Sequence, residues 1–227
     1  MKRLPDGNMR YSLFEAWLSN KQKAMERYFL PPEQRVNFTN KWMAFGSHVA
    51  DSLEQRPIPW WLAKIKVFDA IDKKDPDKKL KEHRLVYDEN EYRIIHEIGG
   101  FMMRGTLDTY DHELHKFADH KSVKATWTQG KTNKHKQLVF YSVLVEEKHD
   151  WVDEECHIFC IPVIDDENGI VRLTGDNATA IPRVITAQER VEMKQLMIDT
   201  ATDISVCYEA YLRGDIKLWD TSAKLLS

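Results

Sequence analysis

Two aspartates and a lysine lie on two short, neighbouring segments that have the pattern of strands. Asp108 ends the first segment, and Asp119 and Lys121 lie in the second. Side chains alternate between the two faces of a strand, so Asp119 and Lys121 point one way and His120 points the other. A polar turn separates the segments and predicts an antiparallel pair that brings Asp108 beside Asp119. We therefore expect two carboxylates and an ammonium group on one face of a hairpin.

This combination could hold a divalent metal ion and a phosphate. Mg²⁺ prefers oxygen ligands and is usually held by one or two carboxylates, which Asp108 and Asp119 could supply. Lys121 could position a water molecule or neutralise charge that develops on the phosphate. A histidine added to such a site would favour Mn²⁺, since imidazole suits softer first-row metals. The alternative is a solvated sheet face, where Asp and Lys form only a weak surface ion pair.

Composition places the chain among intracellular globular proteins. It has 227 residues, 30% of them charged and 11% aromatic, which is enough for a real core. A net charge of −3 means that nucleic-acid binding would need a local basic patch. The three cysteines form no CxxC motif and suit a reducing compartment. With no signal sequence and no apolar run of about 20 residues, we expect a soluble, cytoplasmic protein with no membrane partner.

The hydrophobic pattern predicts one domain over residues 1–227, of the α/β or α+β class, with a central mixed β-sheet flanked by helices. Ser12 is a candidate N-cap for the first helix, and Thr186 with Glu189 forms a candidate capping box for the last, which Gly214 ends. The turn between the first two strands is expected at 88–91. The expected helices are 11–29, 39–54, 133–146 and 187–213, and the expected strands are 82–87, 92–98, 102–108, 117–122, 156–164 and 169–173.

Three motifs follow one another in the order Gly105-Thr106-Leu107-Asp108, Asp119-His120-Lys121, and Gln137 with Tyr141 four residues later. This ordered set resembles the PD-(D/E)XK nuclease superfamily, and within it the RecB-type nuclease domains. That branch has a G-x-(I/L)-D strand end, a D-x-K strand and a helix with Q-x-x-x-Y. The resemblance implies a restriction-endonuclease-like core over residues 80–213, including the C-terminal helix, preceded by a helical part over residues 1–70.

The resemblance also implies a role for each matching position. Asp108 and Asp119 would be metal ligands, Lys121 the catalytic lysine, and the backbone carbonyl of His120 would face the metal. The family's G-x-x-H motif is matched only loosely by Gly46-Ser47-His48, and His48 would be an additional metal ligand. The remaining implied positions are Gln137 and Tyr141 beside the site, and Glu82 as an outer acidic participant.

A lysine-rich stretch follows the candidate catalytic strand directly and contains no acidic residue. Such a run usually belongs to a solvated face, but this position favours contact with a phosphate backbone. Trp127 in the same stretch could stack on a base or cap the core, and the sequence does not choose. The candidate DNA-binding residues are Lys124, Lys131, Lys134, Lys136 and Trp127.

By resemblance, the expected function is that of a Mg²⁺- or Mn²⁺-dependent DNA exonuclease in recombination, repair or phage DNA processing. It would act alone or with a separate helicase or recombination protein. The alternatives are a structure-specific or nicking endonuclease on the same core, and a catalytically silent nucleic-acid-binding subunit. Some relatives hold an iron–sulfur cluster with four cysteines. This chain has three, Cys156, Cys160 and Cys207, so no such cluster is expected.

Overall fold

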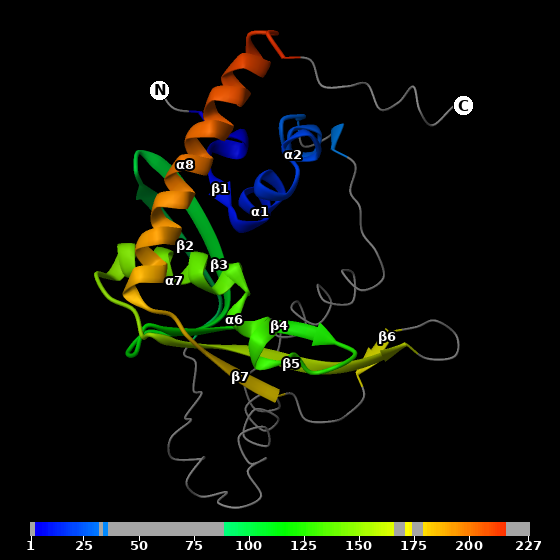
Figure 1. The fold of residues 1–227 in the computed structure, drawn as a ribbon, viewed down its shortest axis with the longest axis vertical. Helices are drawn as coiled ribbons and strands as arrows, with labels where there is room; N and C mark the ends of the chain where they lie inside the picture. The colour runs from blue at the N-terminus through cyan, green and yellow to red at the C-terminus, as the bar shows by residue number, and fades with distance from the viewer. Residues whose placement is uncertain (1–2, 32–33, 36–88, 166–170, 174–178, 217–227) are drawn as a thin grey trace, which may run out of the picture.

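The fold is that of a mixed β-sheet flanked by helices, as the sequence predicts (Figure 1). The structure is a computed structural model that describes residues 3–31, 34–35, 89–165, 171–173 and 179–216. The described helices are the short 3₁₀ helix Pro5–Gly7, α1 (Tyr11–Ser19), α2 (Lys21–Tyr28), α6 (Gln129–Asn133), α7 (Lys136–His149) and α8 (Ala187–Leu212). The described strands are β1 (Met9–Arg10), β2 (Glu89–Ile98), β3 (Phe101–Asp111), β4 (Lys116–Val123), β5 (Glu155–Asp165), β6 (Val171–Leu173) and β7 (Thr179–Val184).

Strands β3 and β5 organise the sheet. β3 pairs antiparallel with β2 along most of its length, and its other edge pairs with β1 at one end and β4 at the other. β4 then runs parallel to β5, which pairs antiparallel with β7 and β6. The β3 residues 105–108 lie between the short pairings with β1 and β4. The G-x-L-D motif therefore lies between the part of β3 that pairs with β1 and the part that pairs with β4.

Helix α7 lies between the sheet and α8. All eight residues 138–145 are buried, because one side of the helix packs on β2 and β3 and another on α8. Gly99 lies in the β2–β3 turn with a φ of +61°, and a side chain there would collide with Ile198 of α8. Helix α8 therefore packs closely on this turn as well as on α7.

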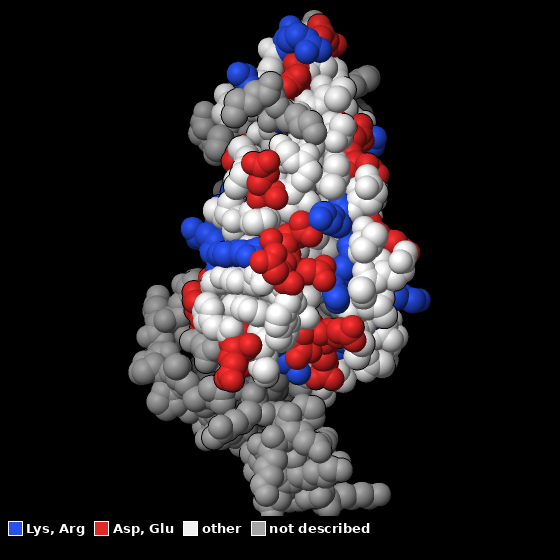
Figure 2. Space-filling model, turned by 90° about the vertical axis from the view of Figure 1, so that its left-hand side faces the viewer, with Lys and Arg blue, Asp and Glu red and all other residues white. Residues whose placement is uncertain are grey.

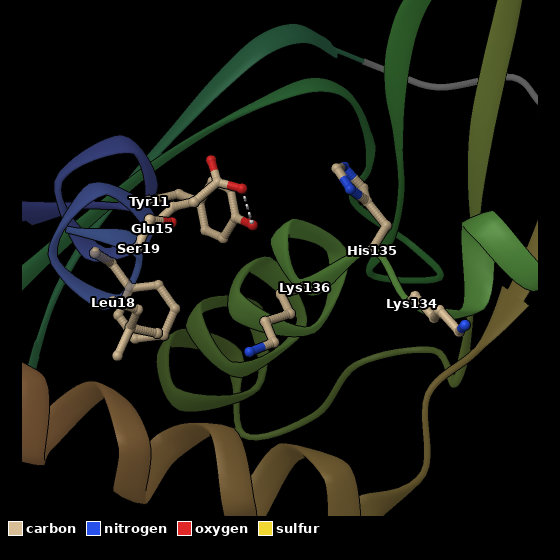
Figure 3. Close-up of a pocket in the computed structure, with 8 residues that line it drawn as sticks. Tyr11, Glu15, Leu18, Ser19, Lys134, His135 and Lys136 are labelled. Atoms are coloured by element: carbon tan, nitrogen blue, oxygen red, sulfur yellow. Dashed lines mark hydrogen bonds between the residues drawn. The ribbon is translucent and has the colours of Figure 1, made fainter.

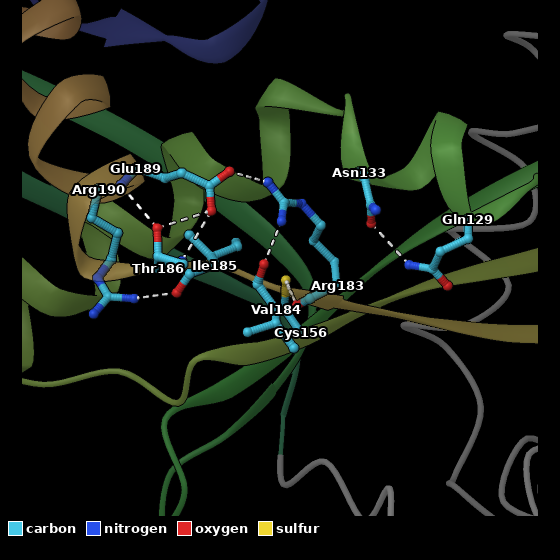
Figure 4. Close-up of polar contacts among 9 residues, drawn as sticks. All are labelled: Gln129, Asn133, Cys156, Arg183, Val184, Ile185, Thr186, Glu189 and Arg190. Atoms are coloured by element: carbon cyan, nitrogen blue, oxygen red, sulfur yellow. Dashed lines mark hydrogen bonds and ion pairs between the residues drawn. The ribbon is translucent and has the colours of Figure 1, made fainter.

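Polar contacts fix the start of α8 (Figure 4). The side chain of Thr186 accepts from the backbone N–H of Glu189, and the Glu189 carboxylate accepts from the backbone N–H of Thr186, which confirms the predicted capping box. Arg183 of β7 forms an ion pair with Glu189. Arg190 donates to Ile185 O at 2.8 Å and to Glu146 of α7 at 3.0 Å. Strand β7, α7 and α8 are therefore joined where α8 begins.

The N-terminal helical segment differs from its prediction. The single helix expected at 11–29 is two helices, because Asn20 leaves the helical conformation and its side chain caps α2 by accepting from the N–H of Lys23. The proposed N-cap, Ser12, is wrong: Arg10 occupies that position and makes no side-chain cap. Trp17 of α1 donates to Asp203 of α8 at 2.8 Å, so α1 is held against α8.

Other boundaries also moved. The helix expected at 133–146 is α7, which begins and ends three residues later, and the turn expected at 88–91 is partly strand, because Glu89 and Asn90 pair with β3. The described elements that were not predicted are the 3₁₀ helix Pro5–Gly7, the two-residue strand β1, helix α6 and strand β7. Pro182 argues against a strand at β7, because proline lacks a backbone donor. The expected helix 39–54 and strand 82–87 lie outside the described residues. No helix in the described part of the chain is long and apolar enough to span a membrane.

Candidate metal and phosphate site

The candidate site lies where β3 and β4 separate. The two strands pair from Asp111–Lys116 to Thr109–Ala118, and β4 then continues as a partner of β5. The same register continued by one step would place Asp108 opposite Asp119. Instead of a further ladder bond, the backbone N–H of His120 donates to Oδ2 of Asp108 at 2.5 Å. The Asp108 carboxylate is thereby held between the diverging strands.

Asp119 and Lys121 share one face of β4, as strand alternation predicts. Lys121 Nζ lies 2.7 Å from Oδ2 of Asp119, whose side chain is almost fully buried. The ring of His120 instead packs near Phe159 of β5, with ring centroids 5.4 Å apart. His135, which joins α6 to α7, approaches Asp119 from another side with its Nε2 at 4.0 Å.

Helix α7 extends this cluster through a chain of hydrogen bonds. Lys121 Nζ donates to Oε1 of Gln137 at 3.1 Å, and Nε2 of Gln137 donates to the hydroxyl of Tyr141 at 3.0 Å. A glutamine and a tyrosine four residues apart lie on one face of a helix, so both reach the same place. The structure thus brings together Asp108, Asp119, Lys121, Gln137 and Tyr141, all of which the motifs singled out.

Gly105 explains how α7 comes so close to β3. A Cβ atom at this position would lie 2.8 Å from Cδ1 of Leu144 and 3.1 Å from the ring of Tyr141. A contact of 2.8 Å does not occur in real packing, so a side chain at this position would force Leu144 or the helix itself to shift. The glycine of the G-x-L-D motif therefore sets the distance between the strand that carries Asp108 and the helix that carries Gln137.

Burial dominates the electrostatics of the cluster. It raises the pKa of Asp108, against the opposing effects of the His120 N–H and Lys121. It also raises the pKa of Asp119, to which the negative charge of Asp108 adds, while Lys121 opposes. Burial alone would lower the pKa of Lys121, but the two carboxylates outweigh it and the net shift is upward. Two carboxylates and one ammonium group leave the buried cluster short of positive charge.

The donors present fit a divalent metal ion. Asp108 and Asp119 offer hard carboxylate oxygens, which suit Mg²⁺ and Mn²⁺, and the cluster carries a net negative charge that a cation would neutralise. Within the described residues, no group of three or more His, Cys, Asp or Glu side chains is arranged to hold a metal. Asp108 and Asp119 are the two carboxylates of this cluster that could bind such an ion.

Glu91 of β2 is a candidate residue of the site that sequence reasoning missed. The β2–β3 register places it opposite Asp108, and its φ of +53° is a conformation that non-glycine residues seldom adopt. Its charge also contributes to raising the pKa of Tyr141, as do the charges of Asp119 and Asp108. Such backbone outliers cluster at functional sites. No local sequence signal marks Glu91, because the segment 88–91 has the composition of a turn.

One predicted metal ligand and one predicted outer residue of the site lie beyond the part of the chain that the structure describes. His48, expected as an additional metal ligand, and Glu82, expected as an outer acidic participant, both lie outside the described residues. For His120 the structure shows the backbone N–H on Asp108, while a role for its carbonyl stays a prediction.

The lysine-rich stretch divides into two parts. Trp127 packs against the core with Lys131 Nζ 3.9 Å from its ring centroid and His135 at its edge. This arrangement favours the core-capping alternative for Trp127 over base stacking. Lys134 and Lys136 instead lie on either side of His135, beside the site. Lys124 is exposed in the loop after β4.

A pocket of about 310 Å³ is lined in part by His135, whose Nε2 lies 4.0 Å from Oδ2 of Asp119 (Figure 3). Helix α1 lines one side of it, and the α6–α7 junction lines the other. Tyr11 and Glu15 of α1 are joined by a hydrogen bond of 3.4 Å. The lining residues are Tyr11, Phe14, Glu15, Leu18, Ser19, Lys134, His135 and Lys136. The volume is at the lower end of what small-ligand sites occupy.

Comparison with known proteins gives a shared fold. No protein-family model matches the chain, and no curated protein matches it. Among solved structures, a protein from Eubacterium rectale described as "Putative exonuclease" is similar over 93% of this chain and 83% of its own, with a TM-score of 0.50 and 12% identity. A second structure, that of SSO0001, is similar over 86% of this chain and 75% of its own, with a TM-score of 0.41 and 13% identity. At such low identity, the first likeness shows a shared fold and nothing of the activity.

Proposed function

We propose that this protein is a metal-dependent nuclease that hydrolyses phosphodiester bonds in DNA, and that it acts as an exonuclease. The observation that carries the proposal is the buried cluster of Asp108, Asp119 and Lys121 at the fork between β3 and β4. The similar protein from Eubacterium rectale is described as a "Putative exonuclease", which supports the proposal of a nuclease and, within that class, of an exonuclease.

Each side chain has a distinct part in the proposed mechanism. Asp108 and Asp119 hold a Mg²⁺ or Mn²⁺ ion, which when bound supplies charge at the phosphate and an activated water. Lys121 keeps its proton, because two carboxylates raise its pKa, and its ammonium group stabilises negative charge on the phosphate. Gln137 and Tyr141 hold Lys121 in place through their hydrogen bonds. Lys134 and Lys136 line the pocket beside His135, where they would contact the DNA backbone.

The proposed biological setting is DNA recombination, repair or phage DNA processing, alone or with a separate helicase or recombination protein. It follows from the motif resemblance and from nothing in the geometry of the site. The cleavage chemistry can be tested independently of that setting.

The decisive experiment compares purified wild-type protein with Asp119→Asn on end-labelled linear and closed circular DNA, single- and double-stranded, with Mg²⁺, Mn²⁺ or a chelator. Asp199→Asn is the matched control, because Asp199 is exposed on α8. We expect metal-dependent loss of linear DNA by the wild type and the control, with circles spared and Asp119→Asn inactive.

Other outcomes would change the proposal in defined ways. Cleavage of closed circles would make the protein an endonuclease on the same core. Tight DNA binding without cleavage under any metal would make it a silent binding subunit. Cleavage that survives Asp119→Asn would remove this cluster from the reaction altogether.

A further inference from the structure

Three arginines gather on the sheet face that points away from α7. Arg10 of β1 is the register partner of Arg104 of β3, and Arg93 of β2 is the partner of Thr106, two positions further along β3. A side chain at position 105 would point toward Leu144 and Tyr141 of α7. The side chains of the residues on either side of Gly105 therefore point to the opposite face of the sheet. The three guanidinium groups therefore share one face of adjacent strands, which we name the arginine face.

Among the described residues, no acidic side chain pairs with the arginines of the arginine face. Within the part of the chain that the structure describes, none of the three side chains makes an ion pair or a side-chain hydrogen bond. Desolvation, and then the charges of Arg10 and Arg93, lower the pKa of Arg104. The carboxylate of Asp6 is close enough for Arg10 to affect its pKa, but it is already bound by both Nη atoms of Arg35, each at 2.8 Å.

Like charges on adjacent strands repel one another, and no contact among the described residues offsets this repulsion. Arg10 and Arg93 are exposed and Arg104 is partly exposed, so an anion has access to all three. A guanidinium group offers several donors in a plane and matches a phosphate group well. Glu97 also lies on this face, but Ile95 separates it from Arg93 along β2.

The position of the arginine face relative to the candidate site adds a second argument. Arg104 lies four residues before Asp108 on the same strand, about 13 Å away at about 3.3 Å per residue. Between them runs the segment 105–108, which lies between the pairings of β3 with β1 and with β4. A chain of phosphates that crosses this edge of the sheet would reach both the arginine face and the carboxylates.

The described residues on the α8 side of the molecule show a different distribution of charge. Figure 2 views the α8 side and shows acidic and basic side chains interspersed over it. There, Lys194 forms an ion pair with Glu147, and Arg190 with Glu146. Phosphates would meet charges of both signs on that surface, whereas the arginine face carries a local excess of positive charge.

We propose that Arg10, Arg93 and Arg104 form a surface that binds the phosphate backbone of DNA beside the catalytic site. The choice of DNA as the partner rests on the proposed function. The surface recognises the backbone without reading the base sequence, since guanidinium contacts to phosphates position DNA and carry no sequence information. Its contribution is to affinity and not to the chemical step.

The test measures binding alone, with fluorescence anisotropy of labelled single- and double-stranded oligonucleotides of two unrelated sequences in the presence of a chelator. The variant is the triple substitution Arg10→Gln, Arg93→Gln and Arg104→Gln. The control is the triple substitution Arg3→Gln, Arg27→Gln and Arg213→Gln, which removes the same charge from exposed positions elsewhere. Thermal unfolding of both proteins checks that they fold.

We expect the arginine-face variant to bind all oligonucleotides at least about tenfold more weakly. Between about 50 and 200 mM salt, its slope of log K against log salt should be shallower than that of the wild type by about 2 to 3 units, close to 0.9 for each lost phosphate contact on duplex DNA. The control should keep the wild-type slope. With metal, kcat at saturating DNA should be unchanged and KM raised.

Two results would overturn the inference. One is wild-type affinity and slope in the arginine-face variant, which would mean that this surface serves another partner, such as a protein. The other is equal weakening by the control, which would mean that only net charge matters. Failure of the proposed function has a different signature: no DNA is cleaved by any protein, while the variant still loses binding that the control retains.

Discussion

The backbone N–H of His120 donates to the carboxylate of Asp108 at 2.5 Å, across the point where β3 and β4 separate. Continuing the register of the Thr109–Ala118 pair would place His120 opposite Leu107. The Asp108 carboxylate accepts from this N–H instead. The β3–β4 pairing stops at Thr109–Ala118, and the hydrogen bond holds the carboxylate in place. A carboxylate held in this way loses little further freedom when it binds a cation.

Substitutions of Asp108 should separate the effect of its hydrogen bond to the His120 N–H from the effect of its charge. Asp108→Asn keeps an oxygen acceptor for the His120 N–H, whereas Asp108→Ala removes both acceptor and charge. In a chelator, we expect Ala to lower the free energy of unfolding by about 1 to 3 kcal/mol, because a buried N–H is left without a partner. Asn should be at least as stable as the wild type, since burial raises the pKa of Asp108 and penalises its charged form.

Thermal unfolding with and without Mg²⁺ checks both statements. The wild type should gain stability from the ion, and both variants should gain much less. Equal stability of the Asn and Ala variants in the chelator would contradict the structural role assigned to the His120 contact.

Substitutions of Lys121 and Gln137 should differ in size and kind. Lys121→Met removes the ammonium group and should lower kcat by about 10² to 10³, the usual cost of losing one charge-stabilising donor. Gln137→Leu leaves the 2.7 Å contact between Lys121 and Asp119 but removes the amide that holds the lysine. We expect a smaller loss in kcat, with KM nearly unchanged in both variants.

The kinetics of the double variant test the connection between the two residues. If Gln137 acts through Lys121, combining the substitutions should cost no more than Lys121→Met alone. Lys23→Met is the control, because Lys23 is exposed on α2. Additive losses would show that Gln137 has a separate role, such as a direct contact with DNA.

Sequence reasoning was most successful where a single rule decides the geometry. Strand alternation placed Asp119 and Lys121 on one face. The motif resemblance, and not a local rule, pointed to Gln137 and Tyr141. It failed where tertiary structure overrides local preference. Glu91 has a positive φ within β2, between the residues that pair with Thr109 and Leu107, and no local pattern encodes that.

The arrangement of the strands was likewise beyond the sequence. β7 contains Pro182, which local rules exclude from most strands, and it is stabilised as the antiparallel partner of β5. The break at Asn20 follows from a side-chain cap, which competes with continuation of the helix. The arginine face depends on the parallel pairing of β1 with β3, and a two-residue strand leaves no signal in the sequence.

The pH dependence of stability should carry two opposite contributions. The pKa of Glu189 is lowered in the fold, where burial is outweighed by the N–H of Thr186 and the Arg183 guanidinium. Its contribution to stability is therefore present above the unfolded pKa of about 4.3 and is lost as the pH falls through the folded value. Glu189→Gln should reduce stability at neutral pH by about 1 kcal/mol, the typical worth of a cap, and flatten the acid side of the profile.

Asp119 should make the metal-free protein less stable as the pH rises, which is opposite to the effect of Glu189. Its pKa is raised, so the folded metal-free protein binds more protons than the unfolded chain, and stability falls as the pH rises through the folded pKa. Asp119→Asn should remove this decline. Urea unfolding in a chelator across pH 4 to 8 measures both effects, and a wild-type profile that rises steadily to neutral pH and is unchanged by Asp119→Asn would refute the second.

Gly105 offers a test of how closely α7 must approach β3. Gly105→Ala places a Cβ 2.8 Å from Cδ1 of Leu144, so we expect a loss of about 1 to 3 kcal/mol from overpacking. The ring of Tyr141, 3.1 Å from the same point, should shift with the helix and disturb the Gln137 contact to Lys121. Shortening the obstructing side chain with Leu144→Ala in the same protein should recover part of the stability. If stability and cleavage were both unaffected by Gly105→Ala, the distance between strand and helix would not depend on the glycine.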